Sequence, residues 1–296
     1  MEECIFYNNL KFKCIENLKN TIQIHAKISK EEYIQKINIL KQHIKQGDIY
    51  EINFCITFEA FNVSIDPLTI YQKLNSISNA PYSALAKFDT KYIISSSPEL
   101  FLTKTGNSLI SKPIKGTAKR GASPEIDKQI KEKLHSNLKE RNENVMIVDV
   151  ARNDLSRLAK KGTVRVNKLF DIETYDQVHQ MISTVSCELK DNTSFEKIIQ
   201  ATFPMASMTG APKIRAMELI DKYELYNRGP YSGALGYIEK NGDFELSVLI
   251  RSIFYDEEKK YLSFTVGSAI TSMCNAEAEY EECLLKAKAM INALSN

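Results

Sequence analysis

The sequence predicts an α+β fold built as a single domain. Long sheet-forming stretches alternate with helical patterns, and several predicted strands follow one another directly, without the strict strand–helix alternation of a parallel α/β protein. The 296 residues contain no low-complexity linker and no repeat at a fixed period. We therefore treat residues 1–296 as one domain with a short N-terminal lead at residues 1–28.

The elements of the first half follow from caps and periodicity. Ser29 and Glu32 form a capping box that opens a helix, and Gly47 ends it. The apolar stripe of this helix consists of Ile34, Ile37, Leu40 and Ile44. Apolar residues at every second position over 52–58 predict a strand. Three further strands are predicted at 92–96, 100–103 and 108–110.

The second half continues in the same way. A long helical pattern covers about residues 125–158, and another helix begins after Pro212, where proline suits the first turn. Strands are predicted at 232–239, 244–254 and 261–266, and a helix over 276–294 closes the chain. This order of elements supports an α+β fold.

Composition excludes several classes of protein. The formal net charge is only +2, so the whole-molecule field does not favour nucleic acid or an anionic membrane as a partner. No stretch is long and apolar enough for a membrane span, and the first residues lack the pattern of a signal peptide. The six cysteines form no C-x-x-C pair, which gives no indication of a zinc site or a redox dithiol. We expect a cytoplasmic protein.

Two pairs of glutamates stand three residues apart on predicted helices, Glu140 with Glu143 and Glu279 with Glu282. If the two helices faced each other, these carboxylates could bind Mg²⁺, which takes one or two carboxylates together with waters and ligand oxygens. Solvated helix charges are the commoner explanation of such spacing. The pattern alone leaves both interpretations open.

Two further features are typical of anion binding. Arg251 ends an apolar strand, where its guanidinium would suit the carboxylate of a ligand or a structural ion pair. The segment Gly267–Ala269 follows a predicted strand and could offer backbone N–H groups to an anion, or form an ordinary turn.

Lys115 lies in the frame Pro113-Ile114-Lys115-Gly116-Thr117. It precedes the glycine, so the frame is not a phosphate-binding loop, and acidic flanks argue against a nucleic-acid patch. A lysine held between proline and glycine could act as an amine nucleophile or be an ordinary surface lysine.

Taken together, several segments resemble the chorismate-utilising enzymes, which include anthranilate, aminodeoxychorismate, isochorismate and salicylate synthases. The resemblance runs from about Ser29 to the C-terminus. It is carried by the blocks GDIYEINF, SSSPELF, PIKGT, ENVMIVDVARNDL, FPMASMTGAPKIRAMELID, YSGALGY with LSVLIRS, and EAEYEE. It implies the chorismate-binding enzyme fold, in which two large β-sheets pack together and are flanked by helices.

The resemblance also implies roles for individual residues. Glu143 and Glu282 would bind Mg²⁺, and Glu140 and Glu279 would hold metal-bound waters. Glu99 would be the general acid/base beside the departing hydroxyl group. The substrate carboxylates would be bound by Arg251, Tyr231, Gly116, Thr117, Gly267, Ser268, Ala269 and Lys286.

Within this family, lysine at position 115 is the mark of the aminodeoxychorismate synthases, whereas the other members usually carry alanine. The resemblance therefore implies component I of such an enzyme, which converts chorismate and ammonia to 4-amino-4-deoxychorismate for 4-aminobenzoate and folate synthesis. Lys115 would add to C2 of chorismate and be displaced by ammonia at C4. The alternatives are an anthranilate synthase component I and a catalytically silent chorismate-binding subunit.

Three positions depart from the family pattern. Glu51 stands where water-using relatives carry lysine and amine-using relatives commonly carry glutamine; we expect it to accept a proton from ammonium. Gln180 replaces a usual histidine, and His179 is displaced by one position. The stretches Met205–Gly210 and Gly267–Ile270 differ from the family's glycine-rich versions but keep mostly small residues.

The ends of the chain carry further expectations. Fewer than 30 residues precede the first motif helix, so the tryptophan pocket of longer relatives is expected to be incomplete, and L-tryptophan is expected neither to bind tightly nor to inhibit. No fused glutaminase or lyase is expected. Ammonia would then come from solution or from a separate glutamine amidotransferase.

Overall fold

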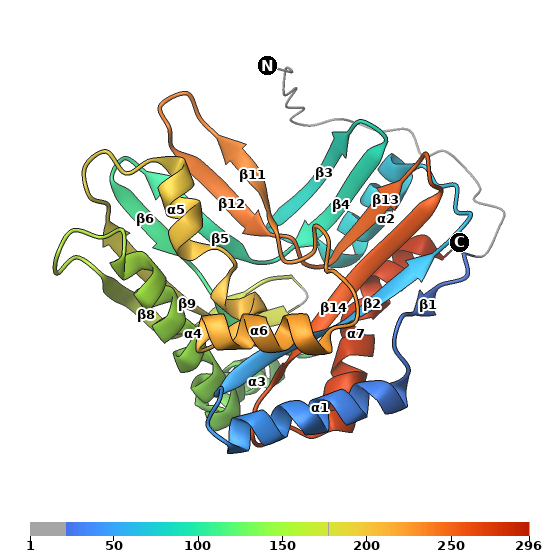
Figure 1. The fold of residues 1–296 in the computed structure, drawn as a ribbon, viewed down its shortest axis with the longest axis horizontal. Helices are drawn as coiled ribbons and strands as arrows, with labels where there is room; N and C mark the ends of the chain where they lie inside the picture. Colours follow the sequence, from blue (N-terminus) through green and yellow to red (C-terminus); the bar gives the residue numbers. More distant parts are fainter. Residues whose placement is uncertain (1–21, 177, 296) are drawn as a thin grey trace.

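The computed structural model describes residues 22–176 and 178–295. Its strands form two antiparallel sheets that diverge like the arms of a V (Figure 1). The first sheet has the order β1 (His25–Ala26), β2 (Glu51–Ala60), β14 (Tyr261–Ile270), β13 (Ser252–Asp256), β4 (Lys91–Ser97), β3 (Tyr82–Phe88), with β10 (Gly210–Ala211) also paired to β2. The second has the order β11 (Ala234–Ile238), β12 (Phe244–Val248), β5 (Leu100–Thr105), β6 (Ser108–Ser111), β9 (Val178–Glu188), β7 (Ile114–Lys119), with β8 (Arg165–Thr174) also paired to β9.

Helices cover the outer faces of both sheets. On the first sheet, α7 (Ala276–Leu294) packs against β14, α2 (Pro67–Ser78) packs against β4, and α1 (Lys30–Lys45) packs against α7. On the second sheet, α3 (Pro124–Ser136) and α4 (Leu138–Ser156) pack against β7 and β9. The remaining helices are α5 (Phe195–Thr202), the 3₁₀ turn η1 (Ala206–Met208) and α6 (Lys213–Tyr223), which lies across β2.

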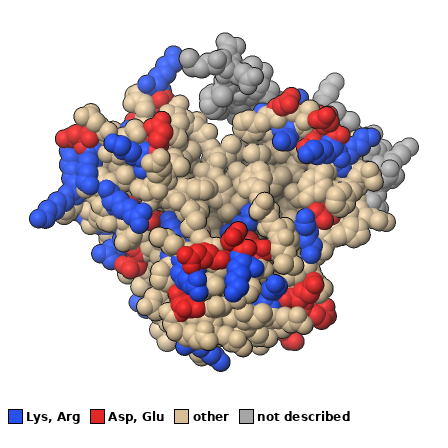
Figure 2. Space-filling model, in the orientation of Figure 1, with Lys and Arg blue, Asp and Glu red and all other residues tan. Residues whose placement is uncertain are grey.

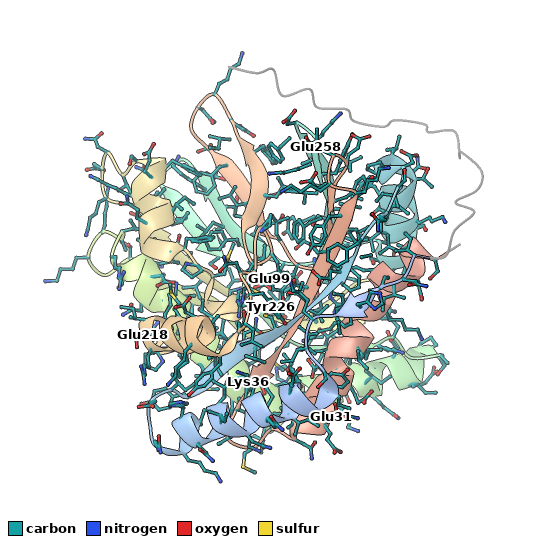
Figure 3. All side chains as sticks on the ribbon, turned by 45° about the vertical axis from the view of Figure 1, so that its right-hand side comes forward. Glu31, Lys36, Glu99, Glu218, Tyr226 and Glu258 are labelled. Carbon is teal, nitrogen blue, oxygen red and sulfur yellow. The ribbon has the colours of Figure 1, made fainter. Side chains whose placement is uncertain are left out.

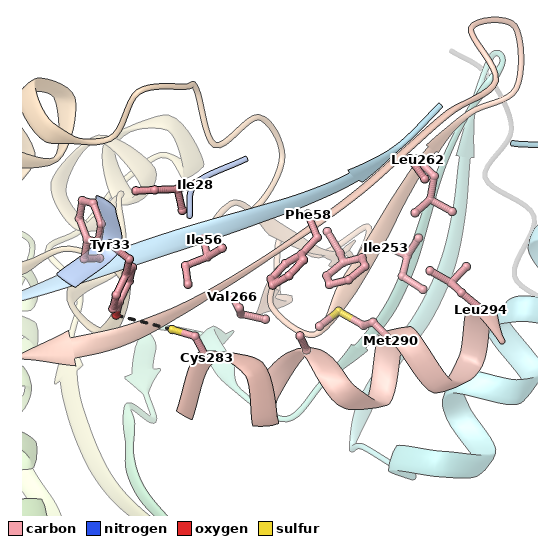
Figure 4. Packing of buried hydrophobic residues seen from close by; sticks show 14 of the residues in the cluster. Ile28, Tyr33, Ile56, Phe58, Ile253, Leu262, Val266, Cys283, Met290 and Leu294 are labelled. Atoms are coloured by element: carbon pink, nitrogen blue, oxygen red, sulfur yellow. Dashed lines mark hydrogen bonds between the residues drawn. The ribbon is translucent and has the colours of Figure 1, made fainter. Parts of the chain in front are cut away.

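Each sheet has its own hydrophobic core. The core of the first sheet is formed between β2, β14 and α7, where Phe58, Val266 and Met290 pack together (Figure 4). A second core, between the second sheet and α4, includes Leu102, Val185 and Leu155. Strand β2 is buried on both faces, because its even-numbered residues enter the first core while Cys55 enters the second. The odd-numbered face of β2 is therefore turned toward the second sheet.

The chain crosses between the sheets twice at one place. Strand β4 continues into β5 through Pro98 and Glu99, and β12 continues into β13 through the segment that ends at Arg251. The two crossings lie side by side, because the Val248 N–H donates to the Glu99 carbonyl at 3.0 Å and the Ser96 N–H donates to the Arg251 carbonyl at 3.2 Å. These backbone hydrogen bonds hold Glu99 and Arg251 at the junction of the two sheets.

Most predicted elements are confirmed. The capping box is present, with the Glu32 N–H 3.1 Å from Ser29 Oγ and the Ser29 N–H 3.0 Å from Glu32 Oε2. The closing helix has the predicted bounds. The α+β class is confirmed, with two antiparallel sheets flanked by helices.

Two predicted elements are each divided. The long helix over 125–158 consists of α3 and α4, since Asn137 ends one and caps the other with its side chain. The strand over 244–254 consists of β12 and β13 in different sheets, because Arg251 has a φ of +52° and turns the chain. Sequence reasoning also missed α2, α5, β3 and β7–β9.

The surface carries charges of both signs. Figure 2 shows Lys and Arg side chains interspersed with Asp and Glu over this face, without a broad area of one sign. No helix in the described ranges is long and apolar enough to cross a membrane.

Candidate active site

Lys115 and Glu51 form a buried ion pair between the two sheets. Lys115 extends from β7 and Glu51 begins β2 on its odd-numbered face, and Lys115 Nζ lies 2.7 Å from Glu51 Oε1. The side chain of Glu51 is only 1% exposed, which excludes the interpretation of Lys115 as a freely solvated surface lysine. The two residues are distant in the sequence, and only the tertiary fold brings them together.

Opposing influences act on the pKa of Lys115. Burial lowers the pKa of the amine, but the charges of Glu51, Glu143 and Glu99 together with the hydrogen bond to Glu51 raise it, and the net effect is upward. In the absence of substrate, the amine is therefore held as an ammonium group. A nucleophilic role requires that it lose this proton when substrate binds.

Glu99 lies at the junction of the sheets (Figure 3). Burial raises the pKa of its carboxyl group to about 7, although the nearby Ser207 hydroxyl and the charge of Lys115 lower it. The group can therefore carry a proton at neutral pH, which suits a general acid. Sequence reasoning missed Ser207, which lines a small cavity together with Glu99, because a serine in a stretch of small residues gives no signal of this position.

Arg251 is held at the same junction without a carboxylate partner in the described part of the chain. Its Nη1 donates to the backbone carbonyl of Lys286 at 3.2 Å. Burial lowers the pKa of the guanidinium, and the influence of Tyr231 and the charge of Glu282 oppose this. The structural ion pair that the sequence left open is thus not formed, and the guanidinium is available to a ligand carboxylate.

Gly267–Ala269 lies inside β14, so this segment does not form the turn that the sequence left open. These residues pair with Cys55, Phe54 and Asn53 of β2, while β13 pairs with β14 only as far as Phe264. On the side away from β2, the backbone of Gly267–Ala269 is therefore not paired with β13. A Cβ at Gly267 would lie 2.8 Å from Cys55 Sγ, so only glycine fits there.

Within this segment, the side chain of Ser268 turns away from the second sheet. Its hydroxyl bonds the Tyr33 hydroxyl at 2.9 Å. Only the backbone of Ser268 remains for a ligand. Lys286 approaches the same strand, since its Nζ donates to the Gly267 carbonyl at 2.9 Å.

The remaining predicted substrate-binding residues differ in environment. Tyr231 is buried, and its hydroxyl accepts a hydrogen bond from Cys55 Sγ at 3.9 Å. Gly116 has a φ of +93°, and a Cβ there would lie 3.1 Å from Glu140 Oε2, so glycine lets β7 approach α4. Thr117 is exposed and pairs with Gln180 in β9.

Glutamates of α4 and α7 lie near one another, because a lysine links the two helices. Lys139 Nζ lies 3.3 Å from Glu279 Oε1 and 3.8 Å from Glu143 Oε1, which links the two helices. Glu143 and Glu279 are 6% and 3% exposed, so the interpretation as solvated helix charges is wrong for these two. Glu282 is less buried and pairs with Lys286 at 2.6 Å.

Burial has marked effects on these carboxyl groups. It raises the pKa of Glu143 to about 7, and it raises the pKa of Glu140 and Glu279 with help from the charge of Glu282. The ion pair with Lys286 outweighs burial at Glu282 and lowers the pKa of that residue. An added cation would offset the cost of burying these charges.

The donor chemistry fits Mg²⁺. Glu143 Oε1 is buried without a hydrogen-bond donor, and carboxylate oxygens are the protein ligands that Mg²⁺ prefers. Within residues 22–176 and 178–295, no three acidic, histidine or cysteine side chains are arranged as a complete metal site. The residues therefore fit a cation that takes one or two carboxylates and completes its shell with water and ligand oxygens.

Other residues of the predicted motifs have structural roles. Lys213 donates to Asp154 at 2.5 Å and to the carbonyls of Thr202 and Pro204, which ties α6 to α4. His179 bonds Asp127 at 2.9 Å and Thr174 at 3.0 Å, so it joins β9 to α3. Sequence reasoning also missed Asn144, which is buried and accepts from Ser183 Oγ at 2.5 Å.

Comparison with known proteins shows the family of this chain. The family model described as chorismate binding enzyme matches residues 3–292. The chain belongs to the chorismate-binding enzyme family. It is 42% identical over 276 residues to the aminodeoxychorismate synthase of Streptomyces pristinaespiralis, covering 92% of this chain and 38% of that protein. It is 37% identical over 281 residues to anthranilate synthase component 1 of Acetivibrio thermocellus, covering 93% of this chain and 55% of that protein.

The structural likeness agrees with this family membership. The crystal structure of anthranilate synthase component I from Streptococcus pneumoniae has a TM-score of 0.83 and 28% identity, covering 92% of this chain and 60% of that chain. The predicted chorismate-binding enzyme fold is confirmed. The chain spans less than two thirds of the length of each of these three relatives.

Proposed function

We propose that this chorismate-binding enzyme is an aminodeoxychorismate synthase component I, which converts chorismate and ammonia to 4-amino-4-deoxychorismate. The observation that carries the proposal is Lys115, which is 12% exposed, pairs with the buried Glu51 and lies near Glu143 and Glu99. An amine placed in this way supports covalent catalysis, and a covalent step divides one difficult substitution into two easier ones.

The substrate carboxylates would be bound at the junction of the sheets. Arg251, which lacks an acidic partner in the described residues, would make a bidentate contact with one carboxylate. Tyr231, Lys286, Gly116, Thr117 and the backbone of Gly267–Ala269 would complete the binding of both carboxylates. This arrangement would place the ring between Lys115 and Glu99.

The chemistry then requires two displacements. The neutral amine of Lys115 forms a bond to C2, the ring double bonds shift, and the C4–O bond breaks while Glu99 gives its proton to the departing oxygen, so that water leaves. Ammonia next forms a bond to C4, the double bonds shift back, and the bond between C2 and Lys115 breaks. The amine of Lys115 is thereby released, and the new nitrogen occupies the carbon that lost the hydroxyl group.

Magnesium is part of the proposal. Glu143 and Glu282 would hold the ion, with Glu140 and Glu279 beside them, and the bound ion would neutralise a substrate carboxylate and help to orient it. We also propose that the product serves folate synthesis, that the protein is cytoplasmic, and that a separate glutamine amidotransferase supplies the ammonia.

The identity of the product tests the function. The purified protein is incubated with chorismate, magnesium chloride and ammonium chloride, and the product is identified by mass spectrometry and chromatography against standards. We expect 4-amino-4-deoxychorismate. Anthranilate as the main product would establish the alternative, anthranilate synthase component I, for which the similarity to the Acetivibrio thermocellus enzyme speaks. No product at all would favour a silent chorismate-binding subunit.

The pKa of Glu99 predicts a pH dependence. Because burial raises this pKa to about 7, the acid loses its proton as the pH rises through about 7, and kcat/KM for chorismate should fall on that alkaline side. Glu99→Gln should lower kcat by about 10²-fold and remove the alkaline limb, since an amide does not titrate. Initial rates between pH 5.5 and 9 measure the loss of kcat and the pH dependence of kcat/KM. If kcat/KM of Glu99→Gln still falls at alkaline pH as in the wild type, the role of Glu99 as an acid is contradicted.

A further inference from the structure

Lys139 bridges the two helices that carry the proposed magnesium ligands. Its Nζ lies 3.3 Å from Glu279 Oε1 on α7 and 3.8 Å from Glu143 Oε1 on α4. The first contact is a hydrogen bond, whereas the second is too long for one. Glu143 Oε1 is therefore buried beside a positive charge and still lacks a hydrogen-bond donor among the described residues. The lysine is held to this carboxylate by charge alone.

The side chain of Lys139 is able to leave this position. It is 47% exposed, against 8% for Glu143 and 4% for Glu279. Lysine carries its charge on a flexible stem of four carbons, which can turn toward solvent while α4 stays in place. Lys286 of α7 is held more firmly, because it contacts Glu282 at 2.6 Å and also donates to a backbone carbonyl of β14 at 2.9 Å.

A divalent cation and this ammonium group compete for the same oxygens. Mg²⁺ binds carboxylate oxygens at about 2.0–2.1 Å, so an ion on Glu143 Oε1 would lie within about 6 Å of Lys139 Nζ in its present position. Two cations at such a distance repel each other strongly where water is partly excluded. The carboxyl groups of Glu279, Glu143 and Glu140 all act on the charge of Lys139, and the ion would draw on the same groups.

We propose that Lys139 is a competitor built into the metal site: its ammonium group bridges Glu143 and Glu279 and must turn away before a divalent cation binds. The lysine thus sets the magnesium concentration at which the site fills, and it keeps α4 and α7 linked at lower concentrations. This inference rests on the proposed function for the identity of the metal, but it concerns binding and not the reaction.

Magnesium affinity tests the competition. Binding of Mg²⁺ to the chorismate-free protein is measured by calorimetry at constant ionic strength for the wild type, Lys139→Met, Lys139→Arg and Lys128→Met. Lys128 is the matched control, because it pairs with Glu132 four residues later at 4.0 Å on α3, where both side chains are exposed. We expect Lys139→Met to lower the Kd for Mg²⁺ by about 5- to 10-fold, since two partly exposed ion pairs no longer have to be broken.

The charge-conserving variant and the control complete this measurement. Lys139→Arg and Lys128→Met should bind Mg²⁺ no more tightly than the wild type, because the first keeps the competing cation and the second lies outside the site. An unchanged or higher Kd in Lys139→Met overturns the proposal, because it would show that the lysine leaves the ion unaffected or prepares the carboxylates for it.

A labelling experiment on the wild type detects the displacement itself. Acetylation by an uncharged N-hydroxysuccinimide ester is followed at constant pH and ionic strength, with and without saturating magnesium chloride, and each lysine is quantified by peptide mass spectrometry. We expect Mg²⁺ to raise the rate at Lys139 by about threefold or more, because competition is reciprocal and the freed amine becomes accessible. The rate at Lys128 should stay the same. A rate at Lys139 that Mg²⁺ leaves unchanged or lowers contradicts the displacement.

These measurements do not depend on the reaction. If the wild type forms no aminated product, but Lys139→Met binds Mg²⁺ more tightly and Mg²⁺ exposes Lys139, the proposed function fails and the competition stands. If 4-amino-4-deoxychorismate is formed, but Lys139→Met binds Mg²⁺ no better than the wild type, the function stands and the competition is overturned.

Discussion

Lys115→Ala is expected to lower the rate of aminodeoxychorismate formation by at least about 10³-fold, which corresponds to about 4 kcal/mol of activation free energy. The reason is the loss of the covalent route, because no other amine in the described structure is paired to Glu51 in this way. Glu99 and the metal would then support only slow direct substitution by ammonia. Initial rates with chorismate and ammonium, measured for both proteins, give the size of the loss.

The covalent adduct is the more specific readout. Intact-protein mass spectrometry during turnover should show a mass increase on the wild type and none on Lys115→Ala. Lys115→Arg should do no better, since a guanidinium stays protonated and cannot attack C2. Lys112, also on the approach to β7 but paired with Glu173 at 4.0 Å, provides a control as Lys112→Ala. Wild-type rates in Lys115→Ala, together with no adduct on the wild type, would exclude lysine as the nucleophile.

Glu143→Ala and Glu282→Ala are each expected to abolish measurable turnover while the protein stays folded. Each change removes one of the two carboxylates proposed to bind the ion directly, whereas Glu140 and Glu279 are proposed only to hold metal-bound waters. Rates measured over a range of magnesium concentrations provide the test. Glu281→Ala is the control, because Glu281 lies on the exposed side of α7 and pairs with Lys30 at 3.1 Å. Metal-independent activity in either variant would contradict the assignment.

Glu143→Gln separates catalysis from stability. Glu143 has a pKa of about 7 in the fold against an ordinary value of 4.5, so its ionised form is disfavoured by burial. The stability that the group contributes is present below pH 4.5 and is lost as the pH rises through about 7. Without magnesium, the difference in Tm between Glu143→Gln and the wild type should therefore increase in favour of Glu143→Gln as the pH rises from 4.5 to about 7. A Tm that falls instead would show that the carboxylate serves the fold.

Local chemistry predicts local structure well in this protein. Ser29 and Glu32 cap a helix through contacts three residues apart, so the sequence is sufficient to place its start. The same reasoning fails at Asn137, because a helical pattern continues on both sides while the side chain caps a new helix. It fails again at Arg251, where one residue with positive φ moves the chain from one sheet to the other.

The sequence proposed the members of the candidate site but could not give their contacts. Recognition of the motifs identified Lys115, Glu99 and Arg251, and the structure brings them to the junction of the sheets. The partner of Lys115 could not be read from the sequence, because Glu51 begins a different strand in the other sheet. Lys139 gave no signal either, since its position between Glu143 and Glu279 depends on how α4 meets α7.

The pairing of β2 with β14 sets the order in which this protein can fold during synthesis. The partners of Ile52 and Ala60 are Ile270 and Leu262, so the chain must be made through Ile270 before this ladder is complete. The hairpins β5–β6 and β11–β12 can form earlier, because their strands are neighbours along the chain. Contacts between such distant segments are slow to form, and unpaired strands promote aggregation. The apolar β2 must therefore remain unpaired with β14 until β14 has been made.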